Sequence, residues 1–433
     1  MPKQEVVLPK SLLSKNTGRG HAQQGNLRFL EKAIHERWAL GQNVVLCWAP
    51  CRSGIDLLMA PHYFLGAYAA THDEADNVDR ANIRAEENRD YVRELISNSR
   101  LMTQDEFKRA EQRLQLQRTS LKLPIPLSEE PHIVSQVEDI VKRHSISFVP
   151  SRAVLLFDIV DFTLFSPFEQ TSQLTSLSYS LNSAYNKLQQ MGIDIDFRRT
   201  TTGDGFYVWA RSVEAISTIH LFQFMLLSIA DNAIARRKSV GNTVPVIRTG
   251  FHVGSHYEFY QAEALNPTMN SYIVGEVTIE LARMLDLAQA GQIFVGDFNA
   301  QIPTSNRDGA YLIDVDAQKF LERVTRNLEG FKGLVLSDEE VVAIHAYLTG
   351  ETGISAGQVA RRFKITDKHG RSRYAYNLRC NIHIKNSKTI IMGLQDYYLP
   401  RSSRSQGKSL ADEKAITTLY PKSRQSPDIT EER

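Results

Sequence analysis

The sequence has few cysteines, little net charge and no long uninterrupted hydrophobic run. Three cysteines (Cys47, Cys51 and Cys380) form no even framework, which excludes a disulfide-stapled scaffold and favours a reducing compartment. Cys47 and Cys51 are not followed by a second Cys or His pair at zinc spacing, so the pattern does not favour a zinc site. A formal net charge of +2 provides no overall field that would attract nucleic acid or an anionic membrane.

Targeting and membrane signals are also lacking. Residues 1–20 are basic and polar, unlike a signal peptide, and the most apolar region, residues 55–70, is interrupted by Asp56 and Pro61. That region is too short to cross a bilayer. We therefore expect a cytoplasmic protein with no integral membrane segment and no nucleic-acid partner.

The length of 433 residues predicts two or three domains. Composition and patterning divide the chain into a disordered N-terminus (1–25), a helical region with a linker (26–145), a central domain (151–336), a small β-rich domain (340–400) and a disordered tail (401–433). In the helical region, Thr103 and Glu106 have the spacing of a capping box. Three prolines between residues 121 and 132 predict a rigid linker.

The central domain alternates strand and helix patterns. The expected elements are a buried strand (154–157), a helix (171–188), a hairpin (194–199 with 206–210), a long apolar helix (213–235), a second hairpin closed around Gly254 (244–253 with 256–261), a helix (278–288) and a strand (292–295). This order predicts an α+β fold of the ferredoxin-like βαββαβ type. Beyond it, residues 338–348 favour a short helix, and residues 372–384 and 389–394 favour paired strands.

Two short stretches of the central domain carry carboxylates at strand edges. FDIVDFT (157–163) places Asp158 at the end of an apolar strand, and TTTGDGFYVW (200–209) places Asp204 in a turn between strands. Two carboxylates presented in this way can hold divalent ions against the phosphates of a nucleotide. Asp is also common in turns for structural reasons, so neither residue alone decides the function.

Five motifs, in order, resemble those of class III nucleotidyl cyclases. They are FDIVDFT, TTTGDGF, the RTGFHVG strand from Arg248 to Gly254, the helix that begins after Gly275 and carries Arg283, and GFKG at 330–333. The resemblance covers most of the central domain. It implies a homodimer with two composite sites, in which the metal ligands and the transition-state Arg come from opposite chains.

The resemblance also implies a role for each matched residue. Asp158 and Asp204, with the backbone carbonyl of Ile159, would bind two divalent ions, Mn²⁺ or Mg²⁺. Arg283 would stabilise charge on the α-phosphate. The turn that contains Phe162 and Thr163 would offer backbone N–H groups to the phosphates. Lys332 would bind the terminal phosphates, although a solvated loop Lys explains that residue nearly as well.

Departures from the family pattern concern the base. Where purine cyclases carry a base-selecting Lys and Asp, this sequence has Thr200 and Tyr272, which favours a smaller pyrimidine ring. In this respect the chain resembles the pyrimidine cyclases of bacterial Pycsar antiphage systems, which make cyclic UMP or cyclic CMP for a separate effector. Arg198 or Arg199 could contact the base or a phosphate, but as strand neighbours they face opposite ways.

Two other departures leave alternatives open. Ile279 stands where the family has a ribose-orienting Asn, and Asp161 replaces a Gly of the phosphate turn. Asp161 could be a third metal ligand or a solvent-facing loop residue.

The expected function is conversion of UTP, or CTP, to its 3′,5′-cyclic monophosphate. The alternatives are an adenylyl or guanylyl cyclase with an atypical base pocket and a catalytically inactive nucleotide-binding module.

The β-rich segment near the C-terminus resembles small sensor domains attached to some bacterial cyclases and nucleotidyltransferases. The resemblance covers about residues 354–399 and would imply sensing of a phage-linked signal. A purely structural appendage is the alternative.

Overall fold

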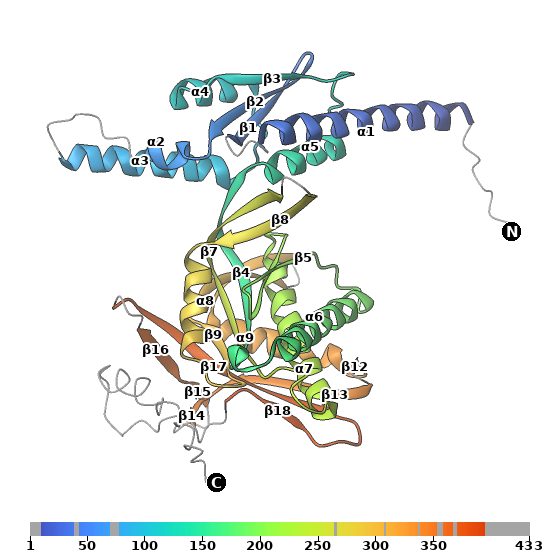
Figure 1. Ribbon diagram of the computed structural model, residues 1–433, viewed down its shortest axis with the longest axis vertical. Helices are drawn as coiled ribbons and strands as arrows, with labels where there is room; N and C mark the ends of the chain where they lie inside the picture. The colour runs from blue at the N-terminus through green and yellow to red at the C-terminus, as the bar shows by residue number, and fades with distance from the viewer. Residues whose placement is uncertain are drawn as a thin grey trace, which may run out of the picture. The chain divides into compact units, whose positions relative to one another are not determined.

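The computed structural model describes residues 10–38, 43–69, 78–263, 266–306, 309–336, 338–352, 358–366 and 370–394. The chain forms two compact units, one of residues 1–150 with 257–273 and one of residues 151–256 with 274–433 (Figure 1). The tail predicted to be disordered (401–433) and residues 1–9 lie outside the described residues.

The first unit is a small three-stranded sheet covered by helices. Its antiparallel sheet has the order β1 (Asn43–Cys51), β2 (Gly54–Pro61), β3 (Arg118–Lys122). Its helices are α1 (Lys10–Trp38), α2 (Phe64–Ala69), α3 (Val78–Ser97), α4 (Gln104–Leu114) and α5 (Pro131–Arg143). Side chains from the two faces of β1 enter different cores: Val45 and Trp48 pack with α1 and α5, whereas Leu46 and Cys47 pack with α3 and α4.

This unit confirms one local prediction and corrects two. Thr103 caps α4, and Glu106 bonds back to the Thr103 backbone, so the capping box is present. The prediction of a wholly helical region is wrong because β1 and β2 are buried on both faces, and a short apolar run of this kind does not distinguish a strand from a helix. The predicted disorder of residues 1–25 is wrong for residues 10–25, which belong to α1.

The second unit contains the ferredoxin-like pattern in the predicted order. Its first elements are β4 (Ile146–Ile159), η1 (Phe162–Leu164), α6 (Pro167–Gln190), β5 (Phe197–Thr201), β6 (Gly205–Ala210), α7 (Ala215–Lys238), β7 (Ile247–Glu263), α8 (Glu276–Asp286) and β9 (Ile293–Gly296). Residues 146–150 of β4 and 257–263 of β7 belong to the first unit, as does all of β8 (Asn266–Val274) except its last residue. The strands are arranged β7-β4-β6-β5, which is the 4-1-3-2 order of a βαββαβ unit. The α+β prediction is therefore confirmed.

The chain then extends the same sheet. The later elements are β10 (Asn299–Asn306), β11 (Gly309–Asp316), α9 (Ala317–Arg326), η2 (Asn327–Phe331), β12 (Val335–Leu336), β13 (Glu339–Leu348), β14 (Gly350–Thr352), β15 (Gln358–Ala360), β16 (Arg362–Thr366), β17 (Ser372–Ile384) and β18 (Ile390–Met392). The sheet order is β12-β13-β17-β9-β7-β4-β6-β5, with β16 and β18 also paired to β17 and β8 paired to β7. Residues 338–348, expected to be helical, form β13 instead, because they pair with β17 along their length.

The predicted separate domain at residues 340–400 is not a compact unit of its own. β17 pairs antiparallel with β9, from Ala375 opposite Gly296 to Leu378 opposite Ile293. Leu378, Cys380 and Ile382 are buried in the same core as α6 and α7. The described C-terminal strands therefore complete the central sheet.

The prediction of a turn at Gly254 is also wrong. Residues 244–261 were expected to turn there, but β7 runs straight through Gly254 and pairs with β8 beyond it. The residues of β7 alternate between two faces: Phe251 contacts Phe222 of α7, whereas Gly250 faces Leu281 of α8. A Cβ on Gly250 would lie 2.9 Å from Leu281 Cδ2, so the glycines of this strand permit close helix packing and do not form a turn.

Helix α7 is the apolar centre of the second unit. Among the described residues it is the one helix long and apolar enough to cross a membrane, and 83% of that apolar window is buried inside the protein. Core helices of soluble proteins pass the same test, so this is weak evidence for a membrane span.

Candidate active site

The structure brings Asp158 and Asp204 together at one end of the sheet. Asp158 ends β4 and pairs in register with Gly205, the first residue of β6. The Ile159 N–H donates to the Asp204 carbonyl at 2.9 Å. A Cβ on Gly205 would lie 1.9 Å from the Phe157 carbonyl oxygen, so only glycine permits this close approach of the two strands.

Asp158 is largely buried and held by Arg248. Arg248 Nε on β7 donates to Asp158 Oδ2 at 2.5 Å, and the Asp158 side chain is 14% exposed. Burial raises the pKa of Asp158 above its ordinary value; Arg248 acts in the opposite direction, and the charges of Asp204 and Asp286 add to the rise. The ionised carboxylate is therefore less favourable here than in water, and an added cation would favour it.

Asp204 is more open to solvent. Thr202 Oγ1 donates to Asp204 Oδ1 at 3.1 Å, and Gly203 before it adopts a φ of 102°, as a Gly-Asp-Gly turn requires. The Asp204 side chain is half-buried. Both residues of the pair are therefore partly buried, and the Thr202–Asp204 hydrogen bond is exposed to solvent.

A tyrosine and a third acid lie near this pair. Tyr207 on β6 donates its hydroxyl to the Thr278 carbonyl of α8 at 3.0 Å. Burial, with the charges of Asp158 and Asp286, raises the pKa of Tyr207 to about 12. The hydroxyl therefore stays protonated near neutral pH. Asp286, at the end of α8, accepts from Arg283 Nη1 at 2.8 Å.

The turn after β4, which the sequence predicts to bind phosphate, is a short 3₁₀ helix, η1. Asp161 precedes it with a φ of 57°, a left-handed conformation that Asp tolerates and that accounts for a Gly at this position in the family pattern. Asp161 and Thr163 are exposed and Phe162 is half-buried. Gln170 of α6 donates to the Phe162 carbonyl at 3.1 Å and to the Phe165 carbonyl at 3.0 Å. These two bonds hold the turn against the first helical turns of α6.

The described residues contain no group of three or more His, Cys, Asp or Glu side chains placed to hold a metal ion. Asp158 and Asp204 provide two carboxylates, and neither Asp161 nor the nearby Asp286 completes a group of three with them in the described residues. Two carboxylates and a carbonyl leave several positions for substrate oxygens and water, which is how Mg²⁺ is ordinarily held. The donor set therefore fits hard divalent ions bound together with a nucleotide.

Other predicted site residues are more dispersed. Thr200 on β5 is half-buried and pairs in register with Tyr207. Arg283 on α8 is engaged with Asp286, and Lys332 is exposed in the loop after η2. Tyr272 belongs to the first unit, where its ring stacks on Phe259 with centroids 5.6 Å apart. The described contacts of this chain do not join Arg283, Lys332 or Tyr272 to the carboxylate pair.

Sequence reasoning missed the contacts of Arg248, Tyr207 and Asp286. Arg248 was noted only as a motif residue, although a strand Arg beside a buried Asp is a common way to compensate charge. His252 of β7 also has a charged partner. It contacts the Glu280 carboxylate, which Arg373 Nε of β17 also contacts at 3.0 Å. Burial raises the pKa of Glu280, but these partners outweigh it, and the net shift is downward.

No protein-family model matches the chain, and no curated protein sequence matches it. Among solved structures, the chain is similar to the guanylate cyclase domain of RhGC from Catenaria anguillulae in complex with GTP (13% identity, 55% of this chain, 100% of that chain, TM-score 0.32). It is also similar to the adenylyl cyclase CyaB from P. aeruginosa (12% identity, 56% of this chain, 97% of that chain, TM-score 0.32). A third is the dimeric guanylyl cyclase domain of RhoGC from the fungus Blastocladiella emersonii (18% identity, 40% of this chain, 97% of that chain, TM-score 0.26). At these identities and TM-scores, the likenesses assign neither a family nor a substrate to this chain.

Proposed function

We propose that this chain is a metal-dependent nucleotidyl cyclase of the class III type. The observation that carries the proposal is the approach of Asp158 and Asp204 across β4 and β6, with the Ile159 N–H bonded to the Asp204 carbonyl. The five sequence motifs support it because they occur in the order of that family. The raised pKa of Asp158 supports it further, because a bound cation would relieve the cost of the buried charge.

In the proposed reaction, the 3′-oxygen of a nucleoside triphosphate attacks the α-phosphorus. A new P–O bond forms, the bond to pyrophosphate breaks, and the hydroxyl proton passes to solvent. Two divalent ions, Mn²⁺ or Mg²⁺, held by Asp158, Asp204 and the Ile159 carbonyl, would favour the 3′-alkoxide and neutralise the leaving pyrophosphate. The backbone N–H groups of Phe162 and Thr163 bind phosphate oxygens in this proposal, and Lys332 binds the terminal phosphates.

Arg283 has its role in a homodimer with two composite sites. In the described contacts of one chain it pairs with Asp286 and not with Asp158. We propose that it stabilises charge on the α-phosphate of a nucleotide held by the carboxylates of the second copy. Arg283→Ala should then lower kcat far more than it raises KM. The opposite pattern would place Arg283 in substrate binding alone.

We further propose a pyrimidine substrate, UTP first and CTP second. Thr200 and Tyr272 replace the Lys and Asp that purine cyclases use, and a site without those partners discriminates poorly in favour of purines. The product would be a cytoplasmic second messenger, cyclic UMP or cyclic CMP, read by a separate effector in antiphage defence. The resemblance of the motifs to pyrimidine cyclases is the support for this role.

A direct assay tests the reaction and its substrate. Purified full-length protein is incubated with Mn²⁺ or Mg²⁺ and each of the four nucleoside triphosphates, and the products are identified by mass. We expect a cyclic pyrimidine nucleotide from the native chain and none from Asp158→Ala or Asp204→Ala. Asp196→Asn is a matched control, because Asp196 is an exposed carboxylate of the same unit, 3.5 Å from Arg211.

The outcomes separate the alternatives. A cyclic purine product would show an adenylyl or guanylyl cyclase with an atypical base pocket. Nucleotide binding without any product would show an inactive module, a possibility favoured by Ile279, which is 47% exposed on α8 where the family has a polar Asn. Full activity in either Asp→Ala variant would refute the metal assignment.

A further inference from the structure

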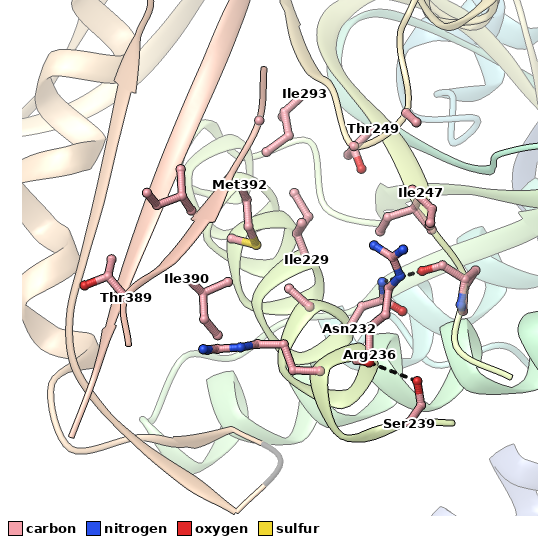
Figure 2. A pocket seen from close by; sticks show the side chains of 18 of the residues that line it. Ile229, Asn232, Arg236, Ser239, Ile247, Thr249, Ile293, Thr389, Ile390 and Met392 are labelled. Carbon is pink, nitrogen blue, oxygen red and sulfur yellow. Dashed lines mark hydrogen bonds between the residues drawn. The ribbon is translucent and has the colours of Figure 1, made fainter. Parts of the chain in front are cut away.

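A cavity lies within the second unit, on the opposite face of β7 from Asp158. Its volume is about 740 Å³, and it is bounded by α7, β7, β18 and the turn before β9 (Figure 2). Ile247 and Thr249 of β7 line the cavity, whereas Arg248 between them faces Asp158. Because strand side chains alternate, this cavity and the carboxylate pair lie on different faces of one strand.

The walls of this cavity are polar and apolar in about equal parts. Side chains of α7 and β18 face each other across it, with Ile229 on one side and Ile390 and Met392 on the other (Figure 2). Ile293 of β9 also lines it. A cavity of this size, with an apolar side and polar groups that can orient a ligand, is large enough for a small molecule.

Two buried side-chain oxygens among these walls lack hydrogen-bond partners in the described part of the chain. Asn232 is 3% exposed and Thr249 is 1% exposed. Asn232 Nδ2 donates to the Pro245 carbonyl at 3.1 Å, but Asn232 Oδ1 and Thr249 Oγ1 have no hydrogen-bond partner in the described part of the chain. Buried oxygens without a partner are costly, and a ligand N–H or O–H group would satisfy them.

The cavity also carries unbalanced positive charge. Arg236 and Arg237 at the end of α7 and Lys388 in the turn before β18 line it, and all three are exposed. Among the described residues that line the cavity there is no Asp or Glu. Basic residues at a helix C-terminus also interact with the helix dipole. Lys388, however, comes from a different element, and Arg237 Nη1 donates to its carbonyl at 3.2 Å, which holds the two elements together.

We propose that this cavity binds a small organic phosphate of about nucleotide size, separate from the substrate at Asp158 and Asp204. Its phosphate would contact Arg236, Arg237 and Lys388, because paired guanidinium groups suit phosphate oxygens. Its ring would lie between Ile229, Ile390 and Met392. Its N–H or O–H donor would reach Asn232 and Thr249. The proposal does not depend on the cyclase reaction.

Calorimetric titration of the full-length chain tests this site. Uridine 5′-monophosphate, 3′,5′-cyclic UMP, adenosine 5′-monophosphate and inorganic phosphate are the probes, and EDTA is present so that metal-dependent binding at the carboxylate pair is not measured. We expect at least one of the nucleoside phosphates to bind more tightly than inorganic phosphate. The double variant Arg236→Gln/Lys388→Gln should weaken that binding by about tenfold or more, because two charge-assisted contacts are lost.

Two further variants make the result specific to this cavity. Lys238→Gln is the matched control: Lys238 lies on the same helix end but is absent from the lining, 3.8 Å from Glu339, and its loss should leave binding within about twofold. Thr249→Val keeps the side-chain shape and removes the hydroxyl. This variant should weaken the binding of the nucleoside phosphate and leave the binding of inorganic phosphate unchanged.

The proposal is overturned if none of the nucleoside phosphates binds at millimolar concentration, or if inorganic phosphate binds equally well. It is also overturned if Lys238→Gln weakens binding as much as the double variant, because a diffuse charge effect would then explain the data. None of these results bears on whether nucleoside triphosphates are cyclised with metal present. The two proposals can therefore fail separately.

Discussion

In the protein without ligand, the ionised form of Asp158 is less stable than it would be in water. Burial raises its pKa, and Arg248 reduces this rise without reversing it. Such a residue is suited to a ligand that brings positive charge, because the charged carboxylate then gains a partner. A residue that served only to end a strand would not need this environment.

Replacing Asp158 separates its functional role from its structural one. A carboxyl whose folded-state pKa is raised stabilises the fold when protonated, and this contribution is lost as the pH rises through the folded-state pKa. At pH 8 in EDTA, Asp158→Asn should therefore unfold at the same temperature as the native chain or a higher one, and still lack cyclase activity. Asp196→Asn should change neither property. A clear fall in the unfolding temperature of Asp158→Asn would contradict this account.

Two buried histidines predict a loss of stability in mild acid. Burial lowers the pKa of His144 to about 4 and that of His256 to about 3, against an ordinary value of 6.5. Below pH 6.5 the unfolded chain takes up these protons before the folded chain does. Stability present above pH 6.5 is thus lost as the pH falls toward the folded-state values.

From pH 7 to pH 5 each histidine should cost about 2 kcal/mol of unfolding free energy. Denaturant unfolding at the two pH values measures this loss. His256→Gln should remove one share of the pH dependence, whereas His62→Gln, at an exposed position, should leave it unchanged. If the unfolding free energy of His256→Gln depended on pH as strongly as that of the native chain, His256 would not contribute to this loss of stability.

Among the elements, the turn between β5 and β6 is the one that delivers Asp204 to Asp158. Its geometry depends on Gly205, where a Cβ would collide with the Phe157 carbonyl oxygen of β4. Neither strand can move away without breaking the register between Asp158 and Gly205. The position of the second carboxylate is therefore a property of strand pairing.

Gly205→Ala should lower the unfolding free energy by about 3 kcal/mol or more and abolish activity, because the clash is with backbone atoms. Gly330→Ala is a suitable control: its φ is not in the positive range, and an added Cβ would meet only Met191 Cε at 3.8 Å. That variant should stay within about 1 kcal/mol of the native chain. Equal stability of the two variants in denaturant unfolding would show that the close approach at Gly205 is not needed.

At the scale of the whole molecule, the described C-terminal strands are part of the second unit. β17 lies between β13 and β9, and Arg373 on it contacts Glu280, which in turn contacts His252 of β7. The described strands therefore contribute both apolar core and a polar connection to α8. Whether they also sense a phage-linked signal stays a prediction.

A chain ended after residue 336 tests this arrangement. It keeps the whole predicted cyclase domain but loses β17 and its buried residues Leu378, Cys380 and Ile382. We expect it to be insoluble or to lack a cooperative thermal transition, because one edge of β9 and part of the core would be uncovered. A chain ended after residue 399 should unfold like the native chain. A soluble, cooperatively folded chain of 336 residues would restore the separate domain that the sequence predicts.

Local patterns in the sequence determined much of the second unit. The hairpin around Gly203-Asp204-Gly205 and the helices α6, α7 and α8 follow from periodicity and turn chemistry, and the motif spacing identified both carboxylates. These features depend on residues close in the chain. Sequence patterns were therefore sufficient for the α+β fold and for the first candidates of the site.

Only the tertiary structure decided what depends on distant partners. Residues 338–348 become a strand because β17 pairs with them, and β7 continues through Gly254 because α8 packs against that glycine. Arg248 meets Asp158 across 90 residues of chain, and the cavity behind β7 closes only when β18 packs near α7. Periodicity reports which face of an element is apolar, but it does not specify which distant element covers that face.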